Sequence, residues 1–426
     1  MGTFIDLFAG CGGLSLGLME SGWTGLFAIE RDELAFSTLK ANLLTSRRRA
    51  YQWPVWLPKE PHDIGLFTRK YHSELRSLRG YVDLIAGGPP CQGFSYAGRR
   101  RSNDPRNNLF MKYLGVVGLV QPKIILLENV RGIASEFSKI PGELKNAEAR
   151  RRAKNAGTFS KRIQRNLERI GYYTFPHLLR AADFGVPQIR PRFFMIGIRK
   201  DLLNDGTFPI DPFAMVDMLR ARFLSTFGLK IDDEVTVRDA ISDLRVRGTD
   251  LVECRDTKGY HEITYRGPKT VYQEQLHGRM NGHAPNSLRL AKHSEPIRKR
   301  FAKIAKGARP GISLSYSERK KFGVKKQHFV VLDANRPSHT LTTLPDDYLH
   351  YAEPRILTVR EYARLQSFPD WFSFHGKYTT GGMLRVKQCP RYTQVGNAVP
   401  PRLARFLGIL IKHYIRAHRI DFSASK

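Results

Sequence analysis

The fold is decided by Phe4-Ile5-Asp6-Leu7-Phe8, an apolar run with the length of a short buried strand, which leads directly into the turn Ala9-Gly10-Cys11-Gly12-Gly13. Apolar residues then recur at helical spacing from Leu14 to Met19, and Gly22 marks the end of that helix. A strand, a glycine-rich turn and a helix in this order predict the first half of a βαβ unit.

Further apolar runs repeat this arrangement, and each borders a small or polar cluster. They are Leu26–Ile29 before Glu30, Val82–Ala86 before Gly87-Gly88-Pro89-Pro90, Ile124–Leu127 before Glu128-Asn129, and Phe193–Ile198 after Gln188-Ile189-Arg190-Pro191-Arg192. Strands that alternate with helical stretches predict a Rossmann-like α/β domain with a parallel sheet. Ligands of such a sheet lie beyond the carboxyl ends of its strands, which is where we expect the functional residues.

The first turn has the features of a nucleoside site. Its glycines let a ligand approach the backbone, and Glu30 follows Gly10 by 20 residues, where an acidic side chain binds the two ribose hydroxyls. The spacing is not the dinucleotide pattern G-x-G-x-x-G, so no pyrophosphate needs to be held. S-adenosylmethionine, which contains adenosine and no phosphate, fits this turn. Asp63, followed by Ile64, is a candidate acceptor for the adenine amino group.

Cys91 is the candidate nucleophile. The four cysteines, at positions 11, 91, 254 and 389, show no C-x-x-C spacing, and we expect them to be reduced. Cys91 lies within Gly87-Gly88-Pro89-Pro90-Cys91-Gln92-Gly93, where prolines fix the backbone and glycines admit a substrate. A basic environment lowers a thiol pKa and favours the reactive thiolate. The alternative, a buried structural cysteine, stays open on these residues alone.

Glu128, Arg190 and Arg192 complete a candidate catalytic set. Period-two alternation places both arginines on one face, although such a pair is often only solvated surface. Addition of a thiolate to carbon 6 of cytosine makes carbon 5 nucleophilic toward a methyl donor. A proton from Glu128 at ring nitrogen 3 and an arginine at the carbonyl oxygen would stabilise that addition. A stacked base is out of reach, so the cytosine must be flipped out.

The charge of the chain predicts a polyanionic partner. Seventy Lys and Arg against 39 Asp and Glu give a net charge of +31, and no apolar run approaches the ~18 residues of a membrane span. Such an excess repels itself unless a polyanion neutralises it, and nucleic acid is the obvious partner. The alternative is a merely soluble basic surface. The N-terminus lacks the pattern of a signal peptide, so we expect a cytoplasmic protein without a membrane partner.

The pattern divides the chain into three parts. Residues 1–200 carry the βαβ rhythm, residues 201–347 form an irregular, smaller inserted domain, and residues 348–426 return to complete the first domain. Capping boxes at Thr236 and Thr358 predict helix starts, and an amphipathic helix is predicted after Pro400-Pro401. The basic, helical stretch 139–169 either forms a solvated face or faces DNA.

Several segments together resemble the DNA (cytosine-5)-methyltransferase family of bacterial restriction-modification systems. They occur in the order of that family and reach both ends of the chain. They are Asp6-Leu7-Phe8-Ala9-Gly10-x-Gly12-Gly13, Gly88-Pro89-Pro90-Cys91-Gln92-Gly93, Glu128-Asn129-Val130, Gln188-x-Arg190-x-Arg192, Arg360-Glu361-x-Ala363-Arg364-Leu365-Gln366-x-Phe368-Pro369 and Gln394-Val395-Gly396-Asn397-Ala398-Val399-Pro400-Pro401.

The resemblance implies roles residue by residue. Cys91 corresponds to the family's nucleophile, Glu128 to the acid at the flipped cytosine and Arg192 to the arginine at its carbonyl oxygen, with Arg190 in the same motif. The middle part of the chain resembles the target-recognition domain, with Thr340-Leu341 as its short shared step. The implied cofactor-binding residues are Phe8, Gly10, Cys11, Gly13, Glu30, Arg31, Asp63, Ile64, Pro90, Asn397 and Ala398.

The resemblance also implies the partners and defines the rival interpretations. It predicts S-adenosylmethionine without a metal, double-stranded DNA, a functional pairing with a restriction endonuclease, and a monomer. Arg31 departs from the family, which often has a large apolar residue there to stack on adenine. The rivals are a tRNA-methylating member, whose Cys-Phe-Thr tripeptide is absent here, an inactive DNA-binding regulator on the same fold, and a basic Rossmann-like enzyme that uses another cofactor.

Overall fold

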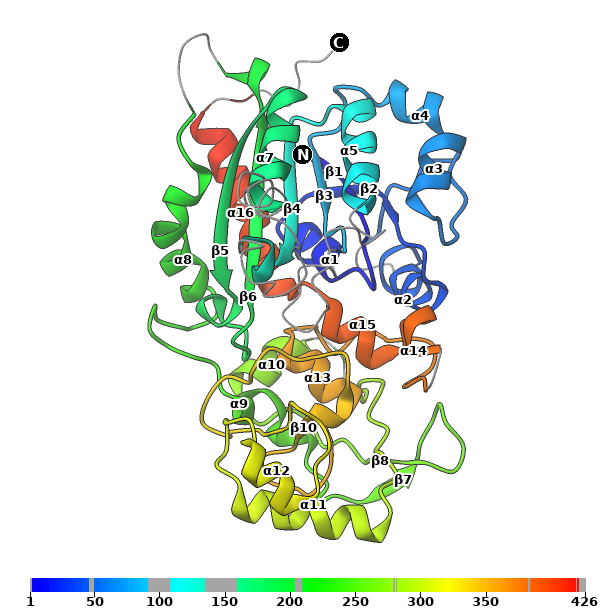
Figure 1. The fold of residues 1–426 in the computed structure, drawn as a ribbon, viewed down its shortest axis with the longest axis vertical. Helices are drawn as coiled ribbons and strands as arrows, with labels where there is room; N and C mark the ends of the chain where they lie inside the picture. Colours follow the sequence, from blue (N-terminus) through cyan, green and yellow to red (C-terminus); the bar gives the residue numbers. More distant parts are fainter. Residues whose placement is uncertain are drawn as a thin grey trace, which may run out of the picture.

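The fold is built around a six-stranded sheet (Figure 1). The computed structural model describes residues 2–45, 50–90, 108–134, 159–203, 209–278, 280, 282–381, 384–418 and 420. Across the sheet the strands follow the order β2-β1-β3-β4-β6-β5. Their bounds are β1 Thr3–Leu7, β2 Thr24–Ile29, β3 Leu84–Gly87, β4 Ile124–Val130, β5 Tyr172–Arg180 and β6 Pro191–Arg199.

The strand directions confirm the predicted α/β sheet and correct one detail. Strands β2, β1, β3 and β4 run parallel to one another, as expected. Strand β6 instead runs antiparallel to both β4 and β5. The sheet is therefore mostly parallel rather than wholly parallel. Strand β5 was not predicted, because its alternating and partly exposed residues lack the continuous apolar run of a buried parallel strand.

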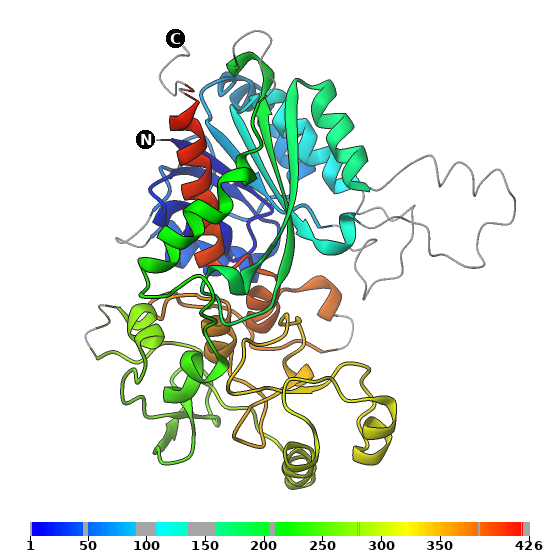
Figure 2. The same ribbon diagram turned by 90° about the vertical axis from the view of Figure 1, so that its left-hand side faces the viewer.

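Helices cover both faces of the sheet (Figure 2). Alternate residues of each strand point to opposite faces, so Ile5 and Ile85 enter one core while Phe4 and Leu84 enter the other. The first of these cores also contains residues of α3 (Ile64–Lys70), α4 (His72–Ser77), α5 (Asn108–Val120) and α7 (Phe159–Arg169). The second contains residues of α1 (Gly13–Glu20), α2 (Glu33–Leu43) and α16 (Pro401–Ala417).

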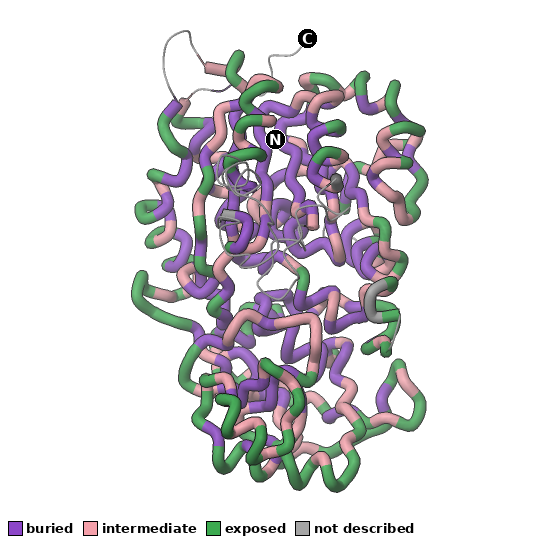
Figure 3. The backbone as a smooth tube through the Cα atoms, viewed as in Figure 1, coloured by how far each residue is buried: buried purple, intermediate pink, exposed green. Residues whose placement is uncertain are grey.

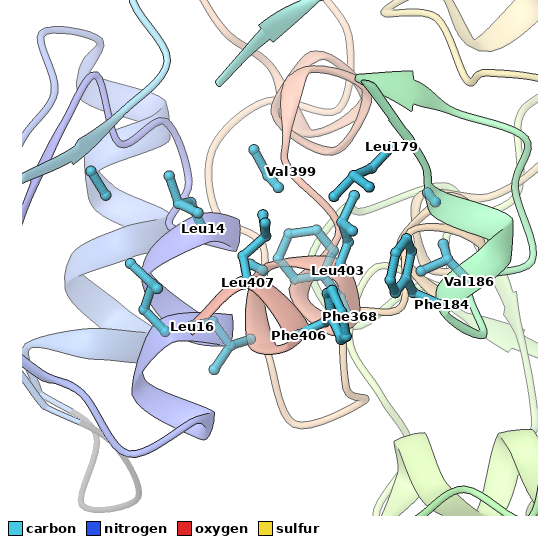
Figure 4. Packing of buried hydrophobic residues seen from close by; sticks show 14 of the residues in the cluster. Leu14, Leu16, Leu179, Phe184, Val186, Phe368, Val399, Leu403, Phe406 and Leu407 are labelled. Atoms are coloured by element: carbon cyan, nitrogen blue, oxygen red, sulfur yellow. The ribbon is translucent and has the colours of Figure 1, made fainter. Parts of the chain in front are cut away.

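Helix α16 brings the end of the described chain back onto its beginning. It follows Pro400-Pro401 as predicted, and its apolar residues pack between α1 and the segment after β5 (Figure 4). The close approach to α1 depends on glycine. A Cβ added at Gly17 would lie 2.4 Å from the Cβ of Ala404 and from the carbonyl oxygen of Pro401. The indole of Trp23 adds a hydrogen bond of 3.0 Å to the carbonyl of Gly408.

The middle part of the chain is irregular, as expected, and most of it, from α9 to α12, lies below the sheet in Figure 1, whereas α8 lies beside the sheet. Its strands form two small two-stranded sheets, β7–β8 and β9–β10. Most residues of α11 and α12 are exposed (Figure 3). The bounds are α8 Val216–Ser225, α9 Val237–Ile241, β7 Leu251–Glu253, β8 His261–Ile263, α10 Val271–His277, α11 Glu295–Gly307, α12 Tyr316–Phe322, β9 Val330–Val331 and β10 Tyr348–Leu349.

Three short helices lead from this part back to the sheet. They are α13 (Val359–Leu365), α14 (Leu384–Lys387) and α15 (Arg391–Asn397). The capping boxes predicted at Thr236 and Thr358 are both present, at the starts of α9 and α13. Helices α9 and α10 are neighbours, and α9 packs on α13, whereas α8 packs on α16 beside the sheet. The middle of the chain therefore contacts the returning segment as well as the sheet.

A buried ion-pair network holds α13 in place. The guanidinium of Arg364 lies 2.5 Å from a carboxylate oxygen of Asp243 and 2.7 Å from one of Asp370, and all three side chains are fully buried. The Asp370 carboxylate is also 3.0 Å from Nδ1 of His277. Removal of one partner from such a network leaves a buried charge unpaired, so the network fixes the position of α13 relative to Asp243.

Candidate active site

The turn after β1 has an unusual backbone that opens one side to a ligand. Phe8 has a φ of +63°, Gly10 of +56° and Gly12 of +97°. A left-handed conformation is costly for a residue with a side chain such as Phe8, and strain of this kind is common at functional sites. Among the described residues, nothing lies within 4 Å of a Cβ added at Gly10. The space beside Gly10 is therefore available to a ligand.

Glu30 is fixed beside this turn by backbone hydrogen bonds. Its carboxylate accepts from the N–H of Gly10 at 2.9 Å, of Arg31 at 2.9 Å and of Asp32 at 2.8 Å. Burial raises the pKa of Glu30, and these N–H groups oppose the shift. Gly10 and Glu30, 20 residues apart in sequence, are thus in direct contact, and the binding of ribose by Glu30 stays a prediction. The Arg31 side chain is exposed to solvent.

Asp63 begins helix α3 and is half-buried. One carboxylate oxygen, Oδ1, accepts from the N–H of Gly65 at 2.8 Å and of Leu66 at 3.2 Å, and it lies 3.5 Å from Nζ of Lys112. Partial burial would raise the pKa of Asp63, but these N–H groups and the Lys112 ammonium lower it. The carboxylate is therefore ionised and oriented. Ile64, next to it, is buried in the core.

Cys11 and Gly13 face protein rather than open space. The thiol of Cys11 is buried 3.6 Å from the carbonyl oxygen of Gln394, and burial raises its pKa to about 12. A Cβ added at Gly13 would lie 2.5 Å from the carbonyl oxygen of Val399. Gly13 therefore permits close packing of this turn against the returning segment, and its contact with a cofactor stays a prediction.

The returning segment places Asn397 and Ala398 at this turn. Asn397 ends α15 and is exposed, while Ala398 is half-buried, with its Cβ 3.2 Å from a Cβ added at Gly13. The segment is also tied to α2, because Thr38 donates a hydrogen bond of 2.7 Å to the side-chain oxygen of Gln394. Residues distant in sequence, at both ends of the chain, therefore share one edge of the sheet.

Glu128 lies at the same edge, at the end of β4. Its carboxylate is 3.2 Å from Nε of Arg192 on the neighbouring strand β6. A Cβ added at Gly88 would lie 2.9 Å from Oε2 of Glu128, so the backbone after β3 contacts the carboxylate. Burial raises the pKa of Glu128, whereas Arg192 and then Arg190 oppose the rise. The geometry forms a carboxyl group that can hold a proton beside a cation.

Cys91 lies outside the described residues, which end at Pro90 on this segment. Pro90 itself is half-buried. Asn129, which follows Glu128, donates a hydrogen bond of 2.9 Å to the carbonyl oxygen of Pro89. Pro89, two residues before Cys91, is thus anchored to the strand that carries Glu128.

Arg190 is close enough to Arg192 and Glu128 to interact electrostatically with both, as a shared face requires. Its side chain is nevertheless only 1% exposed. Its guanidinium donates to the carbonyl oxygens of Leu341 at 3.3 Å and Gly396 at 2.7 Å. Arg190 precedes the first residue of β6. Its guanidinium is engaged by backbone carbonyls, and a direct contact of Arg190 with substrate stays a prediction.

The three cysteines that the structure describes, Cys11, Cys254 and Cys389, are not activated. Burial is the first cause in each case: it raises the pKa of Cys11 to about 12, that of Cys254 to about 11, and that of Cys389 well above its ordinary value. A thiol must be a thiolate to attack, so these three are poor nucleophiles at neutral pH.

Sequence reasoning missed two residues of the site. Asn129 stands inside the quoted Glu-Asn-Val triplet, and its amide was a usable signal for an anchor. Lys112 pairs with Asp63 across 49 positions of sequence and carried no such signal. Within the part of the chain that the structure describes, three or more His, Cys, Asp and Glu side chains nowhere gather as metal ligands would, and no helix is long and apolar enough to span a membrane.

Comparison with known proteins identifies the family. The C-5 cytosine-specific DNA methylase family matches residues 2–413. The Type II methyltransferase M.DdeI of Desulfomicrobium norvegicum is 32% identical over 97% of this chain and 89% of its own length. M.AgeI of Thalassovita gelatinovora, also a Type II methyltransferase, is 30% identical over 96% of this chain and 98% of its own length.

Solved structures agree with this assignment. A crystal structure described as a DNA modification methyltransferase encoded within an Escherichia coli prophage has a TM-score of 0.62 and 27% identity, covering 98% of this chain and all of the other. The Dnmt2 methyltransferase of Schizosaccharomyces pombe shares the fold at a TM-score of 0.50 and 16% identity, covering 98% of this chain and 99% of the other. The sheet edge that joins Gly10, Glu30 and Glu128, together with this match over nearly the whole chain, shows that the protein belongs to the C-5 cytosine-specific DNA methylase family.

Proposed function

We propose that the protein transfers a methyl group from S-adenosylmethionine to carbon 5 of a flipped-out cytosine in duplex DNA, through a covalent adduct with Cys91. One observation carries this proposal. The Glu128 carboxyl lies beside Arg192 and against Gly88, three positions before Cys91, at the sheet edge that also holds Gly10 and Glu30. A proton donor, a cation and a cofactor turn therefore converge on the segment that presents the thiol.

The residues of the chain divide the chemistry among them. The Cys91 thiolate adds to carbon 6 of the ring, and Glu128 gives its proton to nitrogen 3, so the addition does not build up a full negative charge. Arg192 stabilises the charge that develops on the carbonyl oxygen. When bound, S-adenosylmethionine supplies the electrophilic methyl group for carbon 5. A base then removes the carbon 5 proton, and the Cys91 thiolate leaves as the carbon 6 bond breaks.

The cofactor fits the turn after β1. Gly10 leaves open space for the nucleoside, and three backbone N–H groups hold Glu30 in a position to accept the ribose hydroxyls. We assign the adenine amino group to Asp63, whose Oδ2 accepts no hydrogen bond from a described residue. Phe8, Arg31, Ile64 and Pro90 would border the base, and Asn397 and Ala398 would close the site from the returning segment.

DNA recognition would fall to the middle of the chain. We keep residues 1–200 as the catalytic domain, 201–347 as the recognition domain and 348–426 as the returning segment. Helices α11 and α12 carry an excess of exposed Lys and Arg, which suits a phosphate backbone. Because the relatives are Type II methyltransferases, we propose that a cognate restriction endonuclease exists. We also propose that the protein acts as a monomer in the cytoplasm.

Base-resolution methylation sequencing tests the proposal. The chain and its Cys91→Ala variant would each be expressed in a bacterial host that lacks DNA methylation. We expect 5-methylcytosine at one short motif, and only with intact Cys91. Unmodified DNA from a folded protein that binds S-adenosylmethionine would contradict the proposal, and transfer of labelled methyl groups to total RNA would then support the RNA-methylating alternative.

A further inference from the structure

Three polar side chains meet inside the protein where three separate segments come together. Gln188, Arg190 and Gln366 are each 1% exposed or less. They connect residues 338–343, at the end of the proposed recognition domain, with residues 395–398, which carry Asn397 at the cofactor turn. We call Gln188, Arg190 and Gln366 together the joint.

Gln188 contacts two of the segments through the two ends of its amide. Its oxygen accepts from the N–H of Leu341 at 2.9 Å, and its nitrogen donates to the side-chain oxygen of Gln366 at 2.9 Å. The nitrogen of Gln366 then donates to the carbonyl oxygens of Val395 at 2.7 Å and Ala398 at 3.3 Å. An unbroken chain of hydrogen bonds thus runs from Leu341 to Ala398.

Arg190 bridges the same two segments directly. One guanidinium nitrogen donates to the carbonyl oxygen of Leu341 at 3.3 Å and another to that of Gly396 at 2.7 Å. The segments also touch, because a Cβ added at Gly396 would lie 2.4 Å from the carbonyl oxygen of Thr342. No side chain separates the backbone beside Asn397 from the backbone of the recognition domain.

Two of the segments at the joint carry a residue of the proposed site. Arg192 follows Arg190 by two positions, and Asn397 follows Gly396 directly. Thr340 donates to the carbonyl oxygen of Ile189 at 2.8 Å, and the N–H of Ile189 donates to Ser338 at 2.7 Å. A buried hydrogen bond is costly to break without replacement, so a displacement of residues 338–343 must move its partners or lose their hydrogen bonds.

We propose that the joint couples DNA binding to cofactor binding. When residues 338–343 move with the recognition domain on DNA, Gln188 and Arg190 carry the displacement to Arg192 on one side and to Asn397 on the other. Arg190 is then a positioning residue rather than a catalytic one. This inference rests on the proposed function, since it takes duplex DNA as the substrate.

The test measures one coupling factor. The affinity for S-adenosylhomocysteine would be measured by calorimetry with and without a duplex that carries the motif recognised by the protein. The coupling factor is the ratio of these two affinities. Linkage requires the same ratio between the DNA affinities measured with and without S-adenosylhomocysteine. We expect a factor of about five or more for the wild type, within the usual range of allosteric coupling. Arg190→Lys keeps the charge, but one ammonium cannot span both carbonyls, so its factor should fall toward one.

Two further variants make the result decisive. Gln188→Leu removes the hydrogen bonds of Gln188 to Leu341 and Gln366, together with the 3.4 Å bond that Arg190 donates to Gln188, and it leaves the arginine itself in place. Its factor should also fall. Arg402→Lys is the matched control, because Arg402 is another buried arginine, and it donates to the carbonyl of Gly185 at 3.0 Å, away from both segments. It should keep the wild-type factor. Thermal unfolding would identify any variant that fails to fold, in which case the remaining one decides.

The possible failures are distinguishable. A wild type that methylates DNA but shows a factor of one overturns the coupling and leaves the proposed function intact. Folded Arg190→Lys and Gln188→Leu variants that retain the wild-type factor overturn it as well, even if kcat falls. A wild type that neither methylates nor binds DNA contradicts the proposed function itself, and the inference falls with it.

Discussion

Glu128 shows how the surroundings of a single carboxyl group adjust its chemistry. Burial raises its pKa and so favours the protonated form, while the guanidinium of Arg192, 3.2 Å away, favours the ionised form. The raised pKa lets the carboxyl group hold a proton at higher pH than an exposed glutamate does. Because the protonated form is the active one, activity should be complete below this pKa and lost as pH rises through it.

Replacement of Glu128 by glutamine tests that proton. The amide has the same shape but cannot give a proton to ring nitrogen 3, so we expect single-turnover methyl transfer to slow by roughly 10²- to 10⁴-fold. The wild type should lose rate as pH rises because Glu128 loses its proton, and the Glu128→Gln variant should lack this pH dependence. Single-turnover rates across pH, together with S-adenosylmethionine affinity, measure both effects. A rate within a few fold of the wild type would contradict the role of Glu128.

Gly88 tests the contact between the strand ends. A Cβ at this position would lie 2.9 Å from Oε2 of Glu128, so Gly88→Ala should displace the carboxyl group and lower kcat with little change in stability. Gly115→Ala is the control. A Cβ at Gly115 meets no described atom within 4 Å, and alanine in a helix interior should stabilise by about 0.5–1 kcal/mol. Equal kcat values for the two variants would show that the contact does not matter.

The sequence marked single residues well where they lie close together in the chain. The 20-residue spacing assigned Gly10 and Glu30 to one site, and the structure adds a direct hydrogen bond between them. Arg190 could not be predicted in this way, because its partners are the backbone carbonyls of Leu341 and Gly396, more than 150 positions away. Alternation along a strand predicts which residues lie on the same face, but it does not predict which distant segment covers that face.

At the scale of elements, strong periodicity decided what could be predicted. Continuous apolar runs gave the parallel strands, and the stripe from Leu403 to Tyr414 gave α16. Strand β5 carries a proline and several exposed residues, so it resembled a loop, and its antiparallel partner β6 gave no sign of its direction. Strand direction is set by connections and neighbours, which the residues of one strand do not encode.

The crossing of α1 and α16 gives a prediction about stability. Gly17→Ala places a Cβ 2.4 Å from Ala404 and Pro401, so the helices must separate. We expect a loss of about 1–3 kcal/mol in the free energy of unfolding, as for other overpacked cores. Cofactor affinity should fall too, because α16 follows directly on Asn397 and Ala398. Urea denaturation measures the first effect, with Gly115→Ala as the control, and an unchanged midpoint for Gly17→Ala would refute the packing argument.

For the whole molecule, the contacts within the protein do not account for the net charge of +31. Some arginines are buried and structural, such as Arg190, Arg360 and Arg364. Most of the excess therefore remains on the surface, where it adds a force that does not depend on DNA sequence. The composition predicted this force, but not the bases that the protein reads, because recognition depends on side chains whose partners are on the DNA.

The charge predicts a steep dependence of DNA affinity on salt. Each phosphate that a Lys or Arg neutralises releases counterions, so the affinity should fall by about 10³-fold or more between 50 and 200 mM salt if six or more phosphates are contacted. Fluorescence anisotropy with a labelled duplex measures the slope. An affinity that hardly changes over this range would exclude an interface dominated by phosphates.

The central claim is that Cys91 attacks the cytosine, and trapping of the adduct tests it most directly. A duplex with 5-fluorocytosine at the methylated position cannot lose its carbon 5 substituent as a proton, so the adduct persists. Intact-protein mass spectrometry should show the protein joined to the DNA strand with one added methyl group, peptide mapping should place the bond at Cys91, and Cys91→Ala should give no adduct. An adduct at Cys11, Cys254 or Cys389, or none with active wild-type protein, would contradict the mechanism.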